Sequence, residues 1–251
     1  MTTTRGRRPP QGEPVLDRAF ALLRAFTAER PELTLTELTR RSGLPMSTAR
    51  RMAARLTQLG ALERSPDGRY AVGMQLWEIA SLAPRGHGLR QVALPYMEDL
   101  YEVTHQHVLL AVLDGDDAVL VERISAHEAV DILYRVGGRM PLTDTGVGLV
   151  LLATSDPDEQ NRLLDRTTAP AQRSTLRATL AAIRRDDIAI FRPGGDWRVV
   201  SVAAPVRDHS GSVTGALSIV VPDGTVNPRL LTTAVRAAAR GISRQLRPLR
   251  R

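Results

Sequence analysis

Residues 34–70, TLTELTRRSGLPMSTARRMAARLTQLGALERSPDGRY, decide how the first part of this chain folds. Thr34 followed by Glu37 has the spacing of a capping box, which predicts a short helix that begins after Thr34. Glycine can end a helix in a left-handed conformation, so this helix is expected to end near Ser42–Gly43. A second helix is predicted over residues 45–59, after a four-residue turn that is typical of a helix-turn-helix.

The second of these helices has one apolar face and one basic face. At 3.6 residues per turn, four apolar side chains are expected to point inward: Ala49, Met52, Ala53 and Leu56. The opposite side carries Ser47, Arg51, Ala54, Arg55 and Gln58, flanked by Thr48 and Arg50. A charged helix face is in most cases only solvated surface. Here a predicted hairpin follows, with strands at 61–64 and 69–72 around a Pro-Asp-Gly turn, and the whole pattern indicates a winged helix-turn-helix that binds DNA.

The charge of the chain supports this interpretation, because it is concentrated in the first third. Residues 1–75 contain 13 arginines and seven acidic residues, a formal charge of +6, whereas residues 76–251 contain 21 arginines and 20 acidic residues, a formal charge of +1. This division predicts a module that binds a polyanion, joined to a nearly neutral second part. All 34 basic residues are arginine, which a GC-rich genome explains more simply than any function.

Composition excludes several classes of protein. No apolar run approaches the ~20 residues of a membrane span, and the N-terminus lacks the apolar stretch of a secretory signal. The chain has no cysteine, hence no disulfide, no thiolate nucleophile and no zinc finger. We expect a cytoplasmic protein with no membrane association, no bound metal and no cofactor.

The pattern along the chain predicts four parts: a disordered basic tail (1–13), the winged helix-turn-helix (14–74), a linker helix and hinge (75–88) and a second domain (89–251). The tail either contacts the DNA backbone or stays solvated. The first helix is expected at 15–27, with an apolar stripe of Leu16, Ala19, Phe20, Leu23 and Phe26. In the second domain, helices are expected at 89–104, 146–154, 156–166, 173–186 and 228–246, and strands at 107–113, 118–125, 129–136, 188–192, 199–206 and 212–221. Antiparallel strands with flanking helices indicate an α+β fold.

Four segments, in this order, resemble the IclR family of bacterial transcriptional regulators: LDRAFALLRAF (16–26), LTLTELTRRSGLPMSTARRMAARLTQLGALERSPDGRYAVG (33–73), VGGRMPLTDTGVGLVLLA (136–153) and SVAAPVRDHSGSVTGALSIVVP (201–222). The resemblance extends over about residues 14–247. It implies a winged helix-turn-helix joined by a linker helix to a GAF-like α/β effector-binding domain. It also implies a homodimer or dimer of dimers on a palindromic operator in double-stranded DNA, with repression the expected effect. A small organic acid or related metabolite would shift the affinity for DNA.

The residues expected to contact DNA come from the two helices and the wing: Thr36, Arg41, Ser47, Thr48, Arg50, Arg51, Arg55, Arg64 and Arg69. Arginine suits guanine O6 and N7, whereas the hydroxyls and flanking arginines suit phosphate. Carried over from the family, the residues expected to line the effector cavity are Ile132, Tyr134, Met140, Gly146, Val147, Phe191, Ser201, Ser218 and Val220.

The chain departs from the family pattern at three of the positions around this cavity. Thr143 stands where histidine is usual, Leu149 where lysine is usual, and Phe191 replaces a polar residue. We expect these differences to favour a larger or more apolar ligand than an acid of two or three carbons.

Enzymatic readings find little support in the residues. His105 and His107 alternate along a predicted strand, as a metal pair would, but ordinary histidines at a strand edge explain them better. The G-x-S-x-G motif and the phosphate-loop motifs are absent, so no catalytic residue is expected. Two alternatives remain open: a small-molecule enzyme tethered to DNA, and a constitutive DNA binder with a vestigial pocket.

Overall fold

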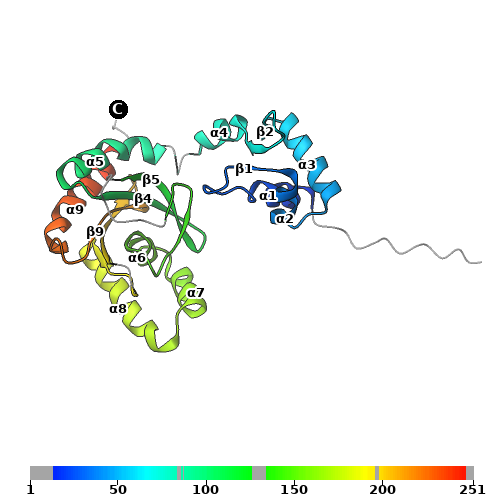
Figure 1. Cartoon of the computed structure of the whole chain (residues 1–251). Coiled ribbons are helices and arrows are strands. Elements are labelled where there is room, and N and C mark those ends of the chain that lie inside the picture. Colours follow the sequence, from blue (N-terminus) through cyan, green and yellow to red (C-terminus); the bar gives the residue numbers. More distant parts are fainter. Residues whose placement is uncertain (1–13, 84–85, 87, 126–133, 196–197, 247–251) are drawn as a thin grey trace, which may run out of the picture. The chain divides into compact units, whose positions relative to one another are not determined.

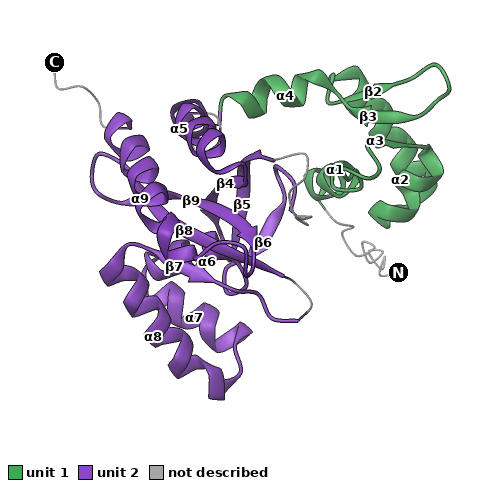
Figure 2. Ribbon diagram, turned by 60° about the vertical axis from the view of Figure 1, so that its left-hand side comes forward, with its two compact units in different colours: residues 1–82 green, residues 83–251 purple. Residues whose placement is uncertain are grey.

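The computed structural model describes residues 14–83, 86, 88–125, 134–195 and 198–246. The chain divides into two compact units, an N-terminal unit of residues 1–82 and a C-terminal unit of residues 83–251 (Figure 2). Within the described ranges, no helix is long and apolar enough to cross a membrane.

The N-terminal unit is a small helical domain with a three-stranded antiparallel sheet in the order β1-β3-β2 (Figure 1). Its elements are α1 (Val15–Leu23), β1 (Glu32–Leu33), α2 (Leu35–Ser42), α3 (Met46–Gln58), β2 (Leu62–Arg64), β3 (Tyr70–Val72) and α4 (Met74–Ser81). The helix-turn-helix and its hairpin therefore form as expected. The two-residue strand β1 was not predicted, and α1 ends at Leu23 rather than at Thr27.

Local caps fix the position of α2. The Thr34 side chain accepts a hydrogen bond from the Glu37 amide at 3.3 Å, and Glu37 Oε2 accepts one from the Thr34 amide at 2.8 Å. Gly43 ends the helix with φ of +70°, a left-handed conformation that residues other than glycine adopt only at a cost in energy. The capping box and the glycine stop predicted from the sequence are both present.

Packing in this unit agrees with the predicted face of α3 but corrects the stripe on α1. Ala49 and Ala53 are fully buried. On α1, however, Leu16 and Phe20 are exposed by 72% and 55%, and the fully buried residue is Leu22. The predicted stripe was wrong at its first turns, because α1 contacts the core only near its C-terminal end.

We expect Thr34→Ala to lower the free energy of unfolding of the N-terminal unit by about 1 kcal/mol, because it removes the cap of α2. Hydrogen exchange of the α2 amides in the full chain measures this change. Thr36→Ala is the matched control, since Thr36 is exposed on the same helix. Equal exchange rates in the two variants would contradict the role of the cap.

The capping box also makes this unit sensitive to acid. The hydrogen bond from the Thr34 amide, followed by that from its hydroxyl, lowers the pKa of Glu37, and the charges of Arg69 and Arg30 add to the effect. Because the pKa of Glu37 is lower in the folded state than in the unfolded state, its carboxylate stabilises the fold at pH values above the unfolded-state pKa. This contribution is lost as the pH falls through the folded pKa. Hydrogen exchange of the α2 amides should therefore depend less on acidic pH in Thr34→Ala than in the unmodified chain.

The C-terminal unit is built on a six-stranded sheet in the order β6-β5-β4-β9-β8-β7, with every neighbouring pair antiparallel. The strands are β4 (His107–Asp114), β5 (Asp117–Ile124), β6 (Arg139–Pro141), β7 (Ala189–Phe191), β8 (Val199–Arg207) and β9 (Val213–Pro222). The helices are α5 (Leu89–Thr104), α6 (Gly146–Ala153), α7 (Pro157–Thr167), α8 (Pro170–Asp186) and α9 (Pro228–Gln245). The predicted α+β class is confirmed.

Helices cover both faces of this sheet (Figure 2). The core on one face holds α5 and α9, with Met97, Leu217 and Ile242 fully buried. The core on the other face holds α6, α7 and α8, with Leu120, Leu164 and Leu180 fully buried. Because side chains alternate along a strand, each central strand supplies both cores.

Two predictions in this unit were wrong or lie outside the described residues. Of the strand expected at 129–136, residues 129–133 are outside the described ranges, and residues 134–136 are not in a strand. The edge of the sheet is formed instead by β6, which pairs with β5. His105 ends α5 with φ of +49°, so it does not alternate with His107 along a strand. Among the described residues there is no group of three or more potential metal ligands.

Candidate DNA-binding surface and effector cavity

The outward face of α3 is basic and exposed. Ser47, Arg50, Arg51 and Arg55 are exposed, while Thr48 is half-buried. The sequence of α3 contains no acidic residue, and Arg50 and Arg51 take part in none of the ion pairs found among the described residues. Arg55 Nη1 donates to Gln58 Oε1 at 3.2 Å, a contact within the helix. The guanidinium groups of Arg50 and Arg51 are thus available to an external anion.

The wing and α2 differ in how far their arginines are already engaged. Arg64 lies over the Tyr70 ring at 5.5 Å, which positions its guanidinium while leaving the side chain exposed. Arg69 forms ion pairs with Asp67 at 3.4 Å and Glu37 at 4.0 Å. Arg41 Nε donates to the Ala25 carbonyl at 2.6 Å, a contact that joins α2 to the end of α1. Arg41 and Arg69 therefore also have partners inside the unit.

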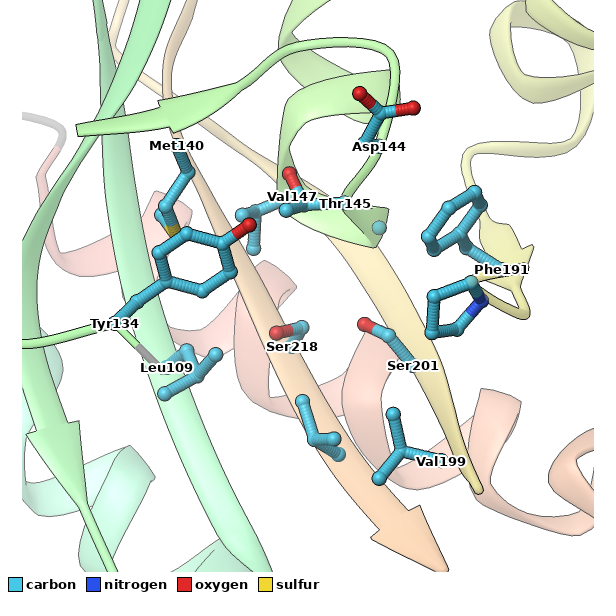
Figure 3. A pocket seen from close by; sticks show the side chains of 13 residues that line it. Leu109, Tyr134, Met140, Asp144, Thr145, Val147, Phe191, Val199, Ser201 and Ser218 are labelled. Atoms are coloured by element: carbon cyan, nitrogen blue, oxygen red, sulfur yellow. The ribbon is translucent and has the colours of Figure 1, made fainter. Parts of the chain in front are cut away.

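A cavity of about 120 Å³ lies over the sheet of the C-terminal unit, beneath the N-terminus of α6 (Figure 3). This is several times the ~15 Å³ that one water needs on the same measure. Eight of the nine residues expected from the sequence line it: Tyr134, Met140, Gly146, Val147, Phe191, Ser201, Ser218 and Val220. Ile132 lies outside the described residues. Five lining residues were not anticipated: Leu109, Asp144, Thr145, Pro193 and Val199.

Strand register explains why these residues meet. Ser218 on β9 lies opposite Leu109 on β4, and Ser201 on β8 lies opposite Val220 on β9. Phe191 on β7 pairs with Ser201 from the other side. The floor of the cavity is therefore formed by side chains from neighbouring strands on one face of the sheet. Of the unanticipated residues, Thr145 could have been found as the cap of α6, whereas Leu109 required the sheet order.

Two serine hydroxyls lie on this floor. Ser218 is fully buried, and its Oγ has no hydrogen-bond partner among the described residues. Ser201 is 8% exposed and lies close to Gly146 at the start of α6. A buried hydroxyl without a partner is costly, so the Ser218 Oγ is a point at which a polar ligand atom would be stabilised.

The N-terminus of α6 supplies further donors. The Thr145 side chain caps the helix by accepting from the Gly148 amide at 3.1 Å. Gly146 and Val147 line the cavity and form the first turn of α6. Amides in the first turn have no partner within the helix, so those of Gly146 and Val147 can hold an anionic oxygen. Glycine at position 146 allows the start of α6 to lie close to Ser201 of β8, because a Cβ there would meet the Ser201 hydroxyl and lie 2.9 Å from Ser201 Cβ.

The walls of the cavity are largely apolar and carry little charge. Asp144 is the single charged side chain among the described lining residues, and Figure 3 shows its carboxylate directed away from the two serines. Burial raises the pKa of Tyr134, and the Asp144 charge raises it further. With no lining arginine or histidine in the described ranges, the cavity suits an apolar body with one anionic group held by backbone amides.

Two of the three departures from the family pattern, Thr143 and Leu149, are not among the described residues that line this cavity. Leu149 is 3% exposed and packs in the core. Both border a neighbouring recess beside α8 that shares Asp144 and Phe191 with the cavity. The expectation that these two positions influence the ligand stays a prediction. Phe191 alone of the three lines the cavity.

Comparison with known proteins assigns both units. The family model of the IclR helix-turn-helix domain matches residues 15–66, and that of the bacterial transcriptional regulator IclR C-terminal region matches residues 83–244. The HTH-type transcriptional regulator XynR of Escherichia coli is 31% identical over 212 residues, 81% of this chain and 84% of XynR. KdgR of Escherichia coli is 29% identical over 240 residues, 91% of each chain.

A solved structure shows the same architecture. The crystal structure of an IclR homolog complexed with 4-hydroxybenzoate, from Microbacterium hydrocarbonoxydans, superposes with a TM-score of 0.87 at 34% identity. The match covers 93% of this chain and 99% of that one. Because the family models cover most of the chain and the order of the domains is the same, this chain belongs to the IclR family of bacterial transcriptional regulators.

Proposed function

We propose that this chain is a cytoplasmic transcriptional repressor whose affinity for a palindromic operator is changed by a small organic effector. The observation that carries the proposal is the unpartnered, fully buried Ser218 hydroxyl on the floor of an apolar cavity. A buried hydroxyl of this kind would be stabilised by a hydrogen bond to a polar ligand atom. The other unit of the chain carries a basic helix-turn-helix, which such a ligand would regulate. A homodimer or dimer of dimers would match the two-fold symmetry of the operator.

In this proposal α3 enters the major groove of double-stranded DNA. Arg50 and Arg51 carry the base and phosphate contacts, and the Ser47 and Thr48 hydroxyls approach the backbone. Arg55 and Arg64 extend the basic surface, while Thr36, Arg41 and Arg69 lie at its edge. Arginines already engaged within the unit contribute less.

The effector is proposed to be a monocarboxylic aromatic acid. A flat apolar body fits between Phe191 and Met140, and one carboxylate fits the amides of Gly146 and Val147. The 4-hydroxybenzoate bound by the Microbacterium homolog supports this class of ligand. An acid of two or three carbons would leave most of the apolar wall in contact with water.

We further propose the domain boundaries given above, with residues 75–88 as linker and hinge. An effector shifts DNA affinity only if it binds two conformations with different affinity, and the linker must transmit that difference. In the N-terminal unit, α4 has no buried residue, and Met74, Trp77 and Ile79 are each at least 59% exposed. A helix held so weakly can change its packing at low cost.

The test is a titration of the full chain with 4-hydroxybenzoate, followed by calorimetry, with pyruvate as the small-acid comparison. Phe191→Ser should weaken 4-hydroxybenzoate binding about five- to thirtyfold, since an aromatic wall worth about 1–2 kcal/mol is lost. Ile190→Ser is the matched control, because Ile190 is the neighbouring residue on β7 and does not line the cavity.

Three results would argue against the proposal. Equal losses of affinity in the two variants would remove Phe191 from the site. Turnover of the ligand would favour the tethered enzyme. Absence of any heat of binding or thermal stabilisation across aromatic acids would favour a constitutive DNA binder.

A further inference from the structure

A second cleft lies in the C-terminal unit, on the face of the sheet opposite to the effector cavity. It has a volume of about 270 Å³ and is bordered by the end of β8 and by α9. Ala204 of β8 and Ala239 of α9, which line it, belong to the core on the α5 and α9 side of the sheet. Four arginines surround it, and we call it the arginine cleft: Arg207, Arg236, Arg240 and Arg244, with Asp187.

Charge is concentrated here far beyond the average of the unit. Residues 76–251 as a whole carry a formal charge of only +1. In contrast, α9 alone holds four arginines and no acidic residue. Among the described residues, the lining of the cleft sets four guanidinium groups against one carboxylate, a formal charge of +3. The arginine content of the whole chain does not account for this arrangement, because elsewhere in the unit acidic residues balance it.

Two of the four arginines are fixed by internal contacts. Arg207 Nη2 binds Asp187 Oδ1 at 2.7 Å, and Arg207 Nη1 donates to the Gly211 carbonyl at 3.1 Å. Arg236 Nη2 donates to the Asp186 carbonyl at 2.5 Å. The Arg236 Nε is buried and has no hydrogen-bond partner in the part of the chain that the structure describes. These contacts hold two guanidinium groups in place at the cleft and leave one buried donor unsatisfied.

The other two arginines are uncommitted. Arg240 and Arg244 are exposed, and neither side chain makes a hydrogen bond or an ion pair with any of the described residues. They follow Arg236 at intervals of four residues, so the three lie along one edge of α9. Like charges at this spacing repel one another. A bound anion would relieve that repulsion.

We propose that the arginine cleft is a second ligand site, which binds a small polyanion bearing phosphate or several carboxylate groups. A guanidinium group binds phosphate and carboxylate groups through paired hydrogen bonds. A single exposed ion pair is weak, but several guanidinium groups around one ligand add their contributions. The ligand class differs from that of the effector cavity, whose described lining contains no arginine. The inference does not depend on the proposed aromatic effector.

The experiment measures thermal unfolding and calorimetric binding of the full chain with sodium pyrophosphate and, separately, with citrate, at constant ionic strength. The test variant is Arg240→Gln/Arg244→Gln, whose side chains make no contact that the fold requires. Arg229→Gln is the control, since Arg229 is exposed on the same helix outside the cleft. Because the basic helix α3 can also bind anions, the result is read from the difference in anion affinity between Arg240→Gln/Arg244→Gln and Arg229→Gln.

We expect saturable binding of at least one of the two anions in the unmodified chain and in Arg229→Gln. We expect its dissociation constant to rise at least about tenfold in Arg240→Gln/Arg244→Gln. Binding of pyrophosphate but not citrate would indicate a phosphate ligand, and binding of citrate but not pyrophosphate would indicate a polycarboxylate. Equal binding in all three proteins, or none in any, would overturn the proposal. So would a change of oligomeric state in the test variant without any anion effect. Binding of 4-hydroxybenzoate should be the same in all three, which separates this test from that of the effector cavity.

Discussion

Arg51→Ala is expected to weaken operator binding about 5- to 150-fold, equivalent to about 1–3 kcal/mol, if Arg51 contacts a base. The side chain is exposed on the outer face of α3 and has no ion-pair partner among the described residues. The variant should also lose sequence preference at one position in each half-site. Electrophoretic titration against the operator and against single-base variants of it measures both effects.

Arg24→Ala is the control, because Arg24 is an exposed arginine of the same unit that stacks on Phe20 at the end of α1. It should bind the operator as the unmodified chain does. Phosphate contacts would show differently, as a uniform loss of affinity with a shallower salt dependence, since each contact adds about −0.9 to the slope. Unchanged affinity and unchanged sequence preference in Arg51→Ala would remove this residue from the interface.

Gly146→Val is expected to abolish the response to effector while leaving operator binding intact. A Cβ at this position would meet the Ser201 hydroxyl and lie 2.9 Å from Ser201 Cβ, at the place where α6 meets the floor of the cavity. The two additional methyl groups of valine would fill the space beside the α6 amides. Overpacking of this kind also costs about 1–3 kcal/mol of stability. Calorimetry with 4-hydroxybenzoate and thermal unfolding separate the two effects.

Gly146→Ala is the milder form of the same change, should the valine variant unfold. Gly194→Ala is the control, because a Cβ there has no neighbour within 4 Å and Gly194 does not line the cavity. A Gly146→Ala variant that remains folded should bind effector more weakly than Gly194→Ala. Full effector binding by a folded Gly146→Val would place the ligand somewhere other than beneath α6.

The sequence predicts those elements whose ends are marked by local chemistry. Thr34, Glu37 and Gly43 define α2 almost to the residue. Strands of two or three residues, such as β1 and β6, have too few residues for an alternating pattern and are defined only by their partners. On α1 the apolar pattern was present, but tertiary contacts reach only the end that carries Leu22.

The cavity could be anticipated only through the family resemblance. That resemblance supplied residues as far apart as Tyr134 and Val220, which no periodicity connects. Leu109 was missed because its place beside Ser218 depends on β4 pairing with β9, a neighbour distant in sequence. Where the side chains of Thr143 and Leu149 lie could not be predicted, because it depends on how α6 and the segment before it pack.

Control of DNA binding by one ligand in this cavity can be tested in a single experiment. The full chain is titrated onto its palindromic operator by electrophoretic mobility shift, with and without saturating 4-hydroxybenzoate, and the unmodified chain is compared with Gly146→Val. We expect effector to change the operator affinity of the unmodified chain and to leave that of the variant unchanged. An operator affinity that does not change with effector in either protein, although calorimetry shows the ligand bound, would contradict it.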